Sequence, residues 1–555
     1  MYKPTKKFIF LHKFGDMKMR RFVLAALAAL AVTTAYGQSN GFKLGKWTEI
    51  HNAVLKELNR SYVDSLPVDR ISLAGIDAML EELDPYTVYI PEEENENLQM
   101  MIAKTYGGIG AIIYKPDRNG SVIIDEPYAG SPAARAGLRC GDEIVAIDGA
   151  TTAGLTSQES SDRMKGKPGT SVTFRVHKVR TADTVDVKIT RERIHLPDVE
   201  YAGMLSDGKT GYIYQSGFTE NVSGAVREAF LSLKAQGMEK LVLDLRGNGG
   251  GVLQEAVSIV SLFVPKGSLV VSARGNNSLE TREYRTTTHP IDTEIPIVVL
   301  VNRFSASASE IVSGALQDLD RATIMGQRTF GKGLVQSIRP LPYNGQLKVT
   351  TAKYYTPSGR CVQAIDYANR GEDGEALQIP DSLTHEFKTA GGRAVRDGGG
   401  ITPDVVLEPH TYSRLALSLF NYSSVPSEYT LRYVRSHPEA DADFRLSDAD
   451  YEDFIAFAKT QDFDYRSSAK ALFDQMKKEL EEDGLAGTMT EQLDALQKAI
   501  EMDKETYLRL KKDEIVPLLE ERIAARYHFQ EAGIRVRLRY DEELKDALTR
   551  PLIAL

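Results

Sequence analysis

The spacing of apolar residues changes near residue 300 from that of a buried strand to that of a helix. Residues 295–301 read IPIVVLV, a continuous β-branched run of the kind that a fully buried strand shows. The apolar residues that follow recur on one face of a helix: Ile311, Val312, Ala315, Leu316 and Leu319. The loop between them is rich in serine. Such a junction exposes side chains at the carboxyl end of a sheet, beside unpaired N–H groups, so it is a suitable place for a nucleophile.

Residues 307–310, SASE, also fit the capping box, in which a serine caps a helix and a glutamate three residues later reaches back to it. This explanation needs no catalysis, and for the tetrapeptide taken alone it is the more economical one. Features elsewhere in the chain have to decide between the two.

Before this junction the pattern predicts two other regions. Two sets of apolar residues, within 47–58 and 71–83, keep a helical period, so residues 38–104 are predicted to form an N-terminal helical cap. From residue 105 to 196 short β runs alternate with glycines: 106–114 reads as a turn and strand, 121–127 as a strand, 131–137 as a small-residue helix and 141–149 as a strand.

This order of elements resembles a PDZ domain. In PDZ domains a glycine turn binds the carboxylate of a peptide C-terminus, and the next strand pairs with the peptide. The resemblance implies that Gly108, Ile109 and Gly110 hold a substrate's C-terminus, beside apolar residues that set the side-chain preference. The alternative is a PDZ-like fold that serves only as packing or as an internal lid.

From residue 197 to 410 strands alternate with helices, which predicts an α/β core. Residues 240–251, KLVLDLRGNGGG, read as a strand that runs into a glycine loop. The loop does not fit phosphate binding, because no Lys-Ser/Thr pair follows and the sixth position of a GxGxxG pattern is Val252. Glycines also let backbone N–H groups approach an anionic oxygen closely, which is the use that we expect here.

The last region, 411–555, is polar, with several amphipathic helical segments and no visible chemistry. We expect a helical platform, which could serve a homo-oligomer or an adaptor protein.

Composition removes several classes of function. With 555 residues the chain should form three or four units. The formal net charge of −9, without a basic stripe, argues against a nucleic-acid partner. Two cysteines, Cys140 and Cys361, cannot make a metal site alone, and the histidines show no paired spacing, so we expect neither a metal nor a cofactor.

Residues 1–37 read as a secretory signal peptide. A lysine- and arginine-rich stretch precedes FVLAALAALAV, which is too short for a spanning helix, and a small-x-small site ends at Gly37. We therefore expect an exported protein. Membrane association through an uncleaved segment is the alternative.

Several motifs together resemble one family. GYIYQSGF, LVLDLRGNGGG, SASASEI, ALQD, TFGKGLVQ and GITPD follow one another around the PDZ-like segment, as in the C-terminal processing, or tail-specific, peptidase family. The resemblance covers residues 44–409. It implies a multidomain α/β protein: a crotonase/Clp-like peptidase core with an inserted PDZ domain, between the N-terminal helical cap and the C-terminal helical region. It also implies protein substrates with apolar C-termini and a periplasmic location.

By the same resemblance, Ser307 is the nucleophile, Lys332 is its general base, and Gln336 positions the lysine. The physical chemistry is compatible with this pair, since a Ser-Lys dyad is a known variant of serine catalysis. The lysine must be neutral, so its pKa must fall to near 7, at a cost of roughly 4 to 5 kcal/mol. Apolar neighbours such as Phe330 and Leu334 would produce this shift by burial.

The resemblance also implies an oxyanion hole. Its donors would be the backbone N–H of Ala308 and that of Gly249 or Gly250 in the glycine loop. Asp318 matches a further family position with a structural or supporting role.

Three alternatives remain open at this point. A Ser-His-Asp triad would need His195 or His289, neither of which stands in a recognisable motif. A non-catalytic PDZ adaptor would bind tails without cleaving them. An acyl-CoA enzyme of the crotonase type could share the α/β core, although the signal peptide and the PDZ segment argue against it.

Overall fold

The structure is a computed structural model that describes residues 39–552, except 96–99, 101–103, 117–118, 180, 372–373, 438, 442, 466 and 502. The predicted signal peptide lies outside the described residues. The chain divides into two compact units, 1–82 and 83–555. Among the described residues, no helix is both long and apolar enough for a membrane crossing.

The described part of the first unit consists of two helices, α2 (Asn40–Ser61) and α3 (Val68–Glu81). Ser39 caps α2 by accepting a hydrogen bond from the N–H of Phe42 at 3.3 Å. Neither helix buries a residue. The predicted helical region therefore exists, but its extension to residue 104 is wrong, because Val88–Ile90 forms strand β1 and pairs with β18 of the second unit.

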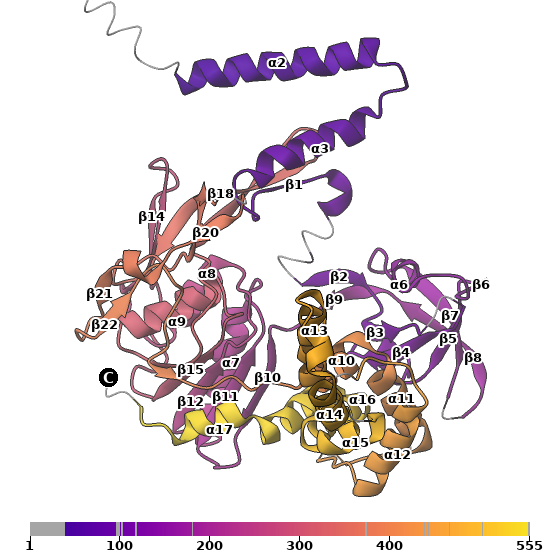
Figure 1. Ribbon diagram of the computed structural model, residues 1–555. Coiled ribbons are helices and arrows are strands. Elements are labelled where there is room, and N and C mark those ends of the chain that lie inside the picture. Colours follow the sequence, from indigo (N-terminus) through magenta and orange to yellow (C-terminus); the bar gives the residue numbers. More distant parts are fainter. Residues whose placement is uncertain are drawn as a thin grey trace, which may run out of the picture. The chain divides into compact units, whose positions relative to one another are not determined.

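The PDZ region contains one main sheet with the strand order β3-β4-β5-β7-β8, and β2 pairs separately with β9 (Figure 1). Its strands are β2 (Thr105–Gly108), β3 (Ala111–Tyr114), β4 (Val122–Pro127), β5 (Glu143–Ile147), β6 (Ala150–Thr151), β7 (Ser171–His177), β8 (Thr184–Thr190) and β9 (Glu192–His195). Its helices are α5 (Pro132–Arg135) and α6 (Ser157–Met164). Alternate residues of β7, Val172, Phe174 and Val176, are buried in its core, as the period of a strand requires.

The centre of the α/β core is a six-stranded sheet with the order β10-β11-β12-β15-β16-β23. The strands are β10 (Val199–Met204), β11 (Thr210–Gln215), β12 (Lys240–Asp244), β15 (Ile297–Val301), β16 (Thr323–Gly326) and β23 (Val405–Val406). All pairs are parallel except β10 with β11. Every residue of β15 is buried, which confirms the strand predicted from its continuous apolar run.

Helices cover both faces of this sheet. Buried residues of α7 (Val222–Ala235), α8 (Leu253–Ser261) and α9 (Ala308–Asp318) share one core with Leu241, Leu243 and Val299 (Figure 1). On the other face Val242, Val298 and Leu300 pack with residues of the C-terminal helices α16 and α17. The last part of the predicted helical region thus completes the α/β core as its third layer.

A second sheet contains β1, β18 (Gln346–Tyr355), β13 (Leu269–Gly275) and β14 (Arg282–Arg285), and β17 (Leu334–Pro340) also pairs with β18. The segment 371–400 carries short strands: β20 (Ala376–Gln378) pairs with β19 (Ile365–Arg370), and β21 (Glu386–Lys388) pairs with β22 (Ala394–Arg396).

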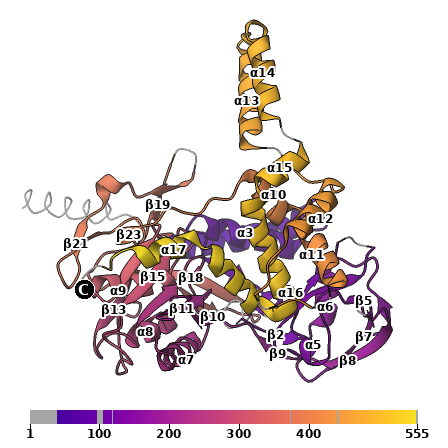
Figure 2. The same cartoon turned by 90° about the horizontal axis from the view of Figure 1, so that it is seen from below.

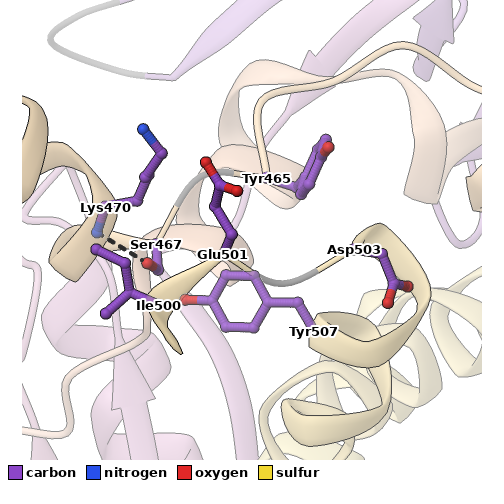
Figure 3. A pocket seen from close by; sticks show the side chains of 7 residues that line it. All are labelled: Tyr465, Ser467, Lys470, Ile500, Glu501, Asp503 and Tyr507. Atoms are coloured by element: carbon purple, nitrogen blue, oxygen red, sulfur yellow. Dashed lines mark hydrogen bonds between the residues drawn. The ribbon is translucent and has the colours of Figure 1, made fainter. Parts of the chain in front are cut away.

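The C-terminal region is helical, as predicted. Its helices are α10 (Arg414–Tyr422), α11 (Val425–Ser436), α12 (Asp448–Lys459), α13 (Ser468–Glu482), α14 (Thr490–Ile500), α15 (Lys504–Leu510), α16 (Lys512–Tyr540) and α17 (Glu542–Thr549). α16 is broken at His528 and Phe529, where the backbone leaves helical values. α13 and α14 form a hairpin (Figure 2), and a pocket near its base is lined only by residues of the C-terminal region (Figure 3).

Candidate active site

Ser307 lies at the predicted strand-to-helix junction, directly before the first residue of α9. Its backbone has φ +55° and ψ −112°, a conformation that costs a residue other than glycine about 1 to 3 kcal/mol. The side chain is partly exposed, whereas every residue of α9 is buried. A strained turn on a rigid, buried helix therefore presents this hydroxyl to solvent.

The two neighbouring serines have structural bonds. Ser305 donates its hydroxyl hydrogen bond to the carbonyl of Leu245 at 2.7 Å, and Ser309 donates to the carbonyl of Asn248 at 2.8 Å. Both side chains are fully buried. These bonds join the serine loop to the glycine loop, so of the three serines Ser307 is the one that is accessible.

The glycine loop lies against Ser307. A Cβ atom built on Gly250 would lie 2.7 Å from the Cβ of Ser307 and 2.9 Å from the backbone N of Ala308, so this close approach requires glycine. The N–H of Gly250 already donates to Asn248 Oδ1 at 2.9 Å. Within the described part of the chain, the N–H groups of Ala308 and Gly249 donate to no protein acceptor, so of the three predicted donors these two are uncommitted.

Lys332 is the third residue of the FGKG turn and is partly buried. Burial, aided by the nearby positive charge of Lys348, lowers the pKa of Lys332 to about 8. The ring of Tyr86 covers the ammonium group, with 4.2 Å between Nζ and the ring centroid. The Tyr354 hydroxyl lies 2.7 Å from the Lys332 carbonyl and 3.1 Å from the Ser307 carbonyl, so one buried side chain holds both segments.

Glu310 connects the two segments more strongly. One carboxylate oxygen, Oε2, accepts from the N–H of Ser307 at 2.8 Å and from the N–H of Lys332 at 2.9 Å. The other, Oε1, accepts from the Thr329 hydroxyl at 2.6 Å and from the Gly331 N–H at 2.8 Å. Burial raises the pKa of this fully buried carboxyl, and the four donors oppose that rise. The sequence predicted a capping box at 307–310, and its return bond, from the Ser307 N–H to Glu310, is the local part of this network.

Gln336 lies on β17, four residues after Lys332. Its amide donates to Thr350 Oγ1 at 3.1 Å, and Thr350 in turn donates to Asp84 Oδ1 at 3.2 Å. In the described structure no hydrogen bond joins Gln336 to Lys332. The sequence did not predict Thr350 and Asp84 as partners, because the pairing of β17 with β18 brings Thr350 to Gln336 and a contact with Thr350 adds Asp84.

Asp318 lies at the opposite end of α9 from Ser307. Its carboxylate pairs with Arg360 at 2.9 Å, both side chains being fully buried, and accepts from the N–H of Ser358 at 2.9 Å. This residue stabilises the loop after β18 and lies roughly 16 Å along the helix from the junction. The two histidines of the triad alternative, His195 and His289, are exposed.

The predicted tail-binding turn lies at the start of β3. Gly108 pairs with Glu192 of β9, and the carbonyl of buried Ile109 accepts from the N–H of Ala133 at 2.9 Å. Gly110 has φ +73°, and a Cβ there would lie 2.6 Å from the Cβ of Ser131. Beyond this turn β3 is an edge strand whose partner in the described sheet is β4, which leaves its other edge for strand addition.

The lowered pKa of Lys332 predicts the pH dependence of any reaction that uses it as a base. Only the neutral amine accepts a proton, so kcat/KM should rise through an apparent pKa of about 8 and level off above it. Lys348→Met removes a positive charge that helps to lower this pKa, so the rising limb should move to higher pH. Rates measured from pH 6 to 10 check both statements, and an unchanged limb in the variant would contradict the assigned cause.

Comparison with known proteins assigns the chain to a family. Residues 209–368 match the model of peptidase family S41, residues 123–178 match a PDZ domain, and residues 419–550 match the C-terminal helical domain of probable PDZ-proteases.

In the part of the chain that the structure describes, no group of three or more His, Cys, Asp or Glu residues is placed to hold a metal ion.

The chain is similar to two curated relatives. A carboxy-terminal-processing protease of Bartonella bacilliformis is 36% identical over 351 residues, which cover 62% of this chain and 78% of the relative. A probable CtpA-like serine protease of Staphylococcus aureus strain COL is 36% identical over 341 residues, covering 61% and 67%. Among solved structures, the photosystem II D1 C-terminal processing protease is 28% identical, with coverage of 64% and 92% and a TM-score of 0.34. The chain therefore belongs to peptidase family S41 and is a serine-type peptidase related to the carboxy-terminal-processing proteases.

Proposed function

We propose that this peptidase cleaves protein substrates with Ser307 as nucleophile and Lys332 as general base, after the PDZ domain has captured an apolar C-terminal tail. The observation that carries the proposal is the position of Glu310. One oxygen of its carboxylate accepts hydrogen bonds from the backbone N–H groups of Ser307 and Lys332. The backbone nitrogens of these two residues therefore lie within two hydrogen-bond lengths of each other. The pKa of Lys332, lowered to about 8, supports the role of a base.

The chemistry follows the general scheme of serine acyl transfer. The neutral Nζ of Lys332 takes the proton of the Ser307 hydroxyl as its oxygen attacks the peptide carbonyl. N–H groups at Ala308 and Gly249 stabilise the oxyanion that forms. The Lys332 ammonium then protonates the leaving amine, which leaves an acyl ester on Ser307. A water molecule, deprotonated by the same lysine, hydrolyses this ester and restores both groups.

Membership of a peptidase family argues against the non-catalytic adaptor and the acyl-CoA enzyme. Capture of the tail is supported by the PDZ domain, by the free edge of β3 and by the glycine turn at 108–110. The proposal also includes export to the periplasm, on the basis of the basic and apolar stretches of residues 1–37.

The tail requirement is tested with two unstructured peptides of identical sequence, one ending in a free apolar C-terminus and the other amidated. The free peptide should be cleaved with a KM lower by roughly tenfold or more, since amidation removes the carboxylate that the turn binds. Mass spectrometry of the products measures both rates. Equal cleavage would contradict tail capture and leave the hydrolysis in place, whereas cleavage of neither peptide would contradict the hydrolysis.

A further inference from the structure

Residues at the N-terminus of α17 bind Arg246, the residue that begins the glycine loop. The guanidinium of Arg246 contacts both carboxylate oxygens of Asp541, at 2.5 and 3.1 Å, and Glu543 Oε2 at 3.3 Å. It also pairs with Asp244 of β12 at 2.6 Å. The Arg246 side chain is only 16% exposed. Because a buried guanidinium contacts a carboxylate through two nitrogens, it fixes the orientation of the two groups as well as the distance between them.

Glu543 also reaches the second catalytic segment. Its Oε2 lies 3.5 Å from the side-chain amide of Gln327, the first residue after β16, and its Oε1 accepts from the N–H of His410 at 2.9 Å. Gln327 precedes Lys332 by five residues, and Arg246 precedes Gly249 by three. The start of α17 thus contacts the two chain segments that lead into the site.

α17 is well placed to act as an anchor. Leu544 and Ala547 are buried against the core sheet in one cluster with Val298, Leu300 and Met325. Burial opposes ionisation of Asp541, but the hydrogen bond and charge of Arg246, the N–H of Leu544 and the charge of Arg537 together outweigh it, so the pKa of Asp541 is lowered. The carboxylates also lie at a helix N-terminus, which favours negative charge.

The glycine loop needs anchors of this kind. Gly247 and Gly250 have φ values of +75° and +96°, and glycines have more backbone freedom to lose than other residues. The inner side of the loop is held by Asn248, whose side chain bonds Gln215 and Gly250. Arg246 supplies a side-chain anchor on the α17 side. The described contacts of the loop thus reach the serine segment, the chain around Gln215 and Phe218, and the C-terminal helix.

We propose that Asp541 and Glu543 are positioning residues of the peptidase: through Arg246 they hold the glycine loop at the place that the oxyanion requires. The C-terminal helix is then part of the active-site scaffold. This inference rests on the proposed function, since it concerns the same oxyanion site.

The test compares Asp541→Asn with Asp546→Asn in the full chain. Asp546 lies on the same helix, and within the described structure its carboxylate pairs only with Arg550 at the surface, at 2.9 Å, so its variant is the matched control. Asp541→Asn should lower kcat roughly 10- to 100-fold, as a small misplacement of a catalytic group does, and change KM by less than about twofold. Amide hydrogen exchange at 246–251 should accelerate in Asp541→Asn and stay unchanged in the control. Asp541→Glu keeps the charge and should recover part of kcat.

The outcomes separate the inference from the proposed function. Unchanged kcat and exchange in Asp541→Asn would overturn the inference, as would exchange that accelerates evenly over the whole core sheet. If Asp541→Asn does not fold, Glu543→Gln removes the weaker contact and should show a smaller loss in the same direction; its equivalence to the control would overturn the inference. If the unmodified chain hydrolyses no peptide, but amide hydrogen exchange at 246–251 still accelerates in Asp541→Asn, the result would support the anchoring of the glycine loop by α17 and contradict the proposed peptidase reaction.

Discussion

Ser307→Ala should reduce peptide hydrolysis by roughly 10⁴- to 10⁶-fold, the loss that follows removal of a serine nucleophile from a catalytic unit. Ser305 and Ser309, the adjacent serines, are buried and bonded to backbone carbonyls, so neither can replace it. Alanine keeps the contact with Gly250, because the Cβ atom remains. The variant should therefore fold normally and lose the reaction alone.

The control for this variant is Ser313→Ala. Ser313 is buried in the same helix, and among the described residues its hydroxyl donates only to the carbonyl of Ser309 one turn earlier, at 2.8 Å. It should retain activity within about threefold. Lys332→Met is a second test of the same reaction. Its loss of activity should be comparable to that of Ser307→Ala, because the effects of residues that act as one catalytic unit do not add: removing either one costs about as much as removing both. If Ser307→Ala kept activity close to that of the unmodified chain, another group would have to be the nucleophile.

Glu310→Ala should lower the free energy of unfolding by roughly 3 to 5 kcal/mol. The change leaves three backbone N–H groups and one hydroxyl without their acceptor at a fully buried position, namely those of Ser307, Gly331, Lys332 and Thr329. Denaturant unfolding of the full chain measures the loss. Activity should also fall, because the same carboxylate holds the segments of Ser307 and Lys332 together.

Glu159→Ala is the matched control, since Glu159 completes an exposed capping box at the start of α6. Its loss should cost only about 1 kcal/mol or less. Equal costs for the two variants would show that Glu310 acts merely as a helix cap. A much larger cost for Glu310→Ala would identify it as the connection between the two catalytic segments.

Local patterns predicted the parts of the site that depend on nearby residues. The apolar run at 295–301 predicted β15, and the period after it predicted α9 with Ser307 at its start. Strand burial and helix capping are set within about ten residues, so the sequence alone carries them.

Local patterns failed where contacts join distant parts of the chain. Residues 88–90 were predicted to belong to a helical cap, but they form a strand that pairs with β18. The bond of Gln336 to Thr350 depends on the pairing of β17 with β18, and Asp84 joins it from 266 residues away. Such partners have no periodic signal, because register is set by the assembled sheet.

The sequence by itself determined the family and the strand-to-helix junction at Ser307, and it predicted that this serine pairs with a lysine on a glycine turn. Only the tertiary structure decided that Glu310 connects these two residues, that Gly250 lies against Ser307 with its N–H already donated, and that α17 covers the sheet and holds Arg246. The physical reason is the range of the interactions. The periods of helices and strands depend on residues that are close in sequence. The hydrogen bonds of a buried carboxylate depend on donors that packing brings together from distant parts of the chain.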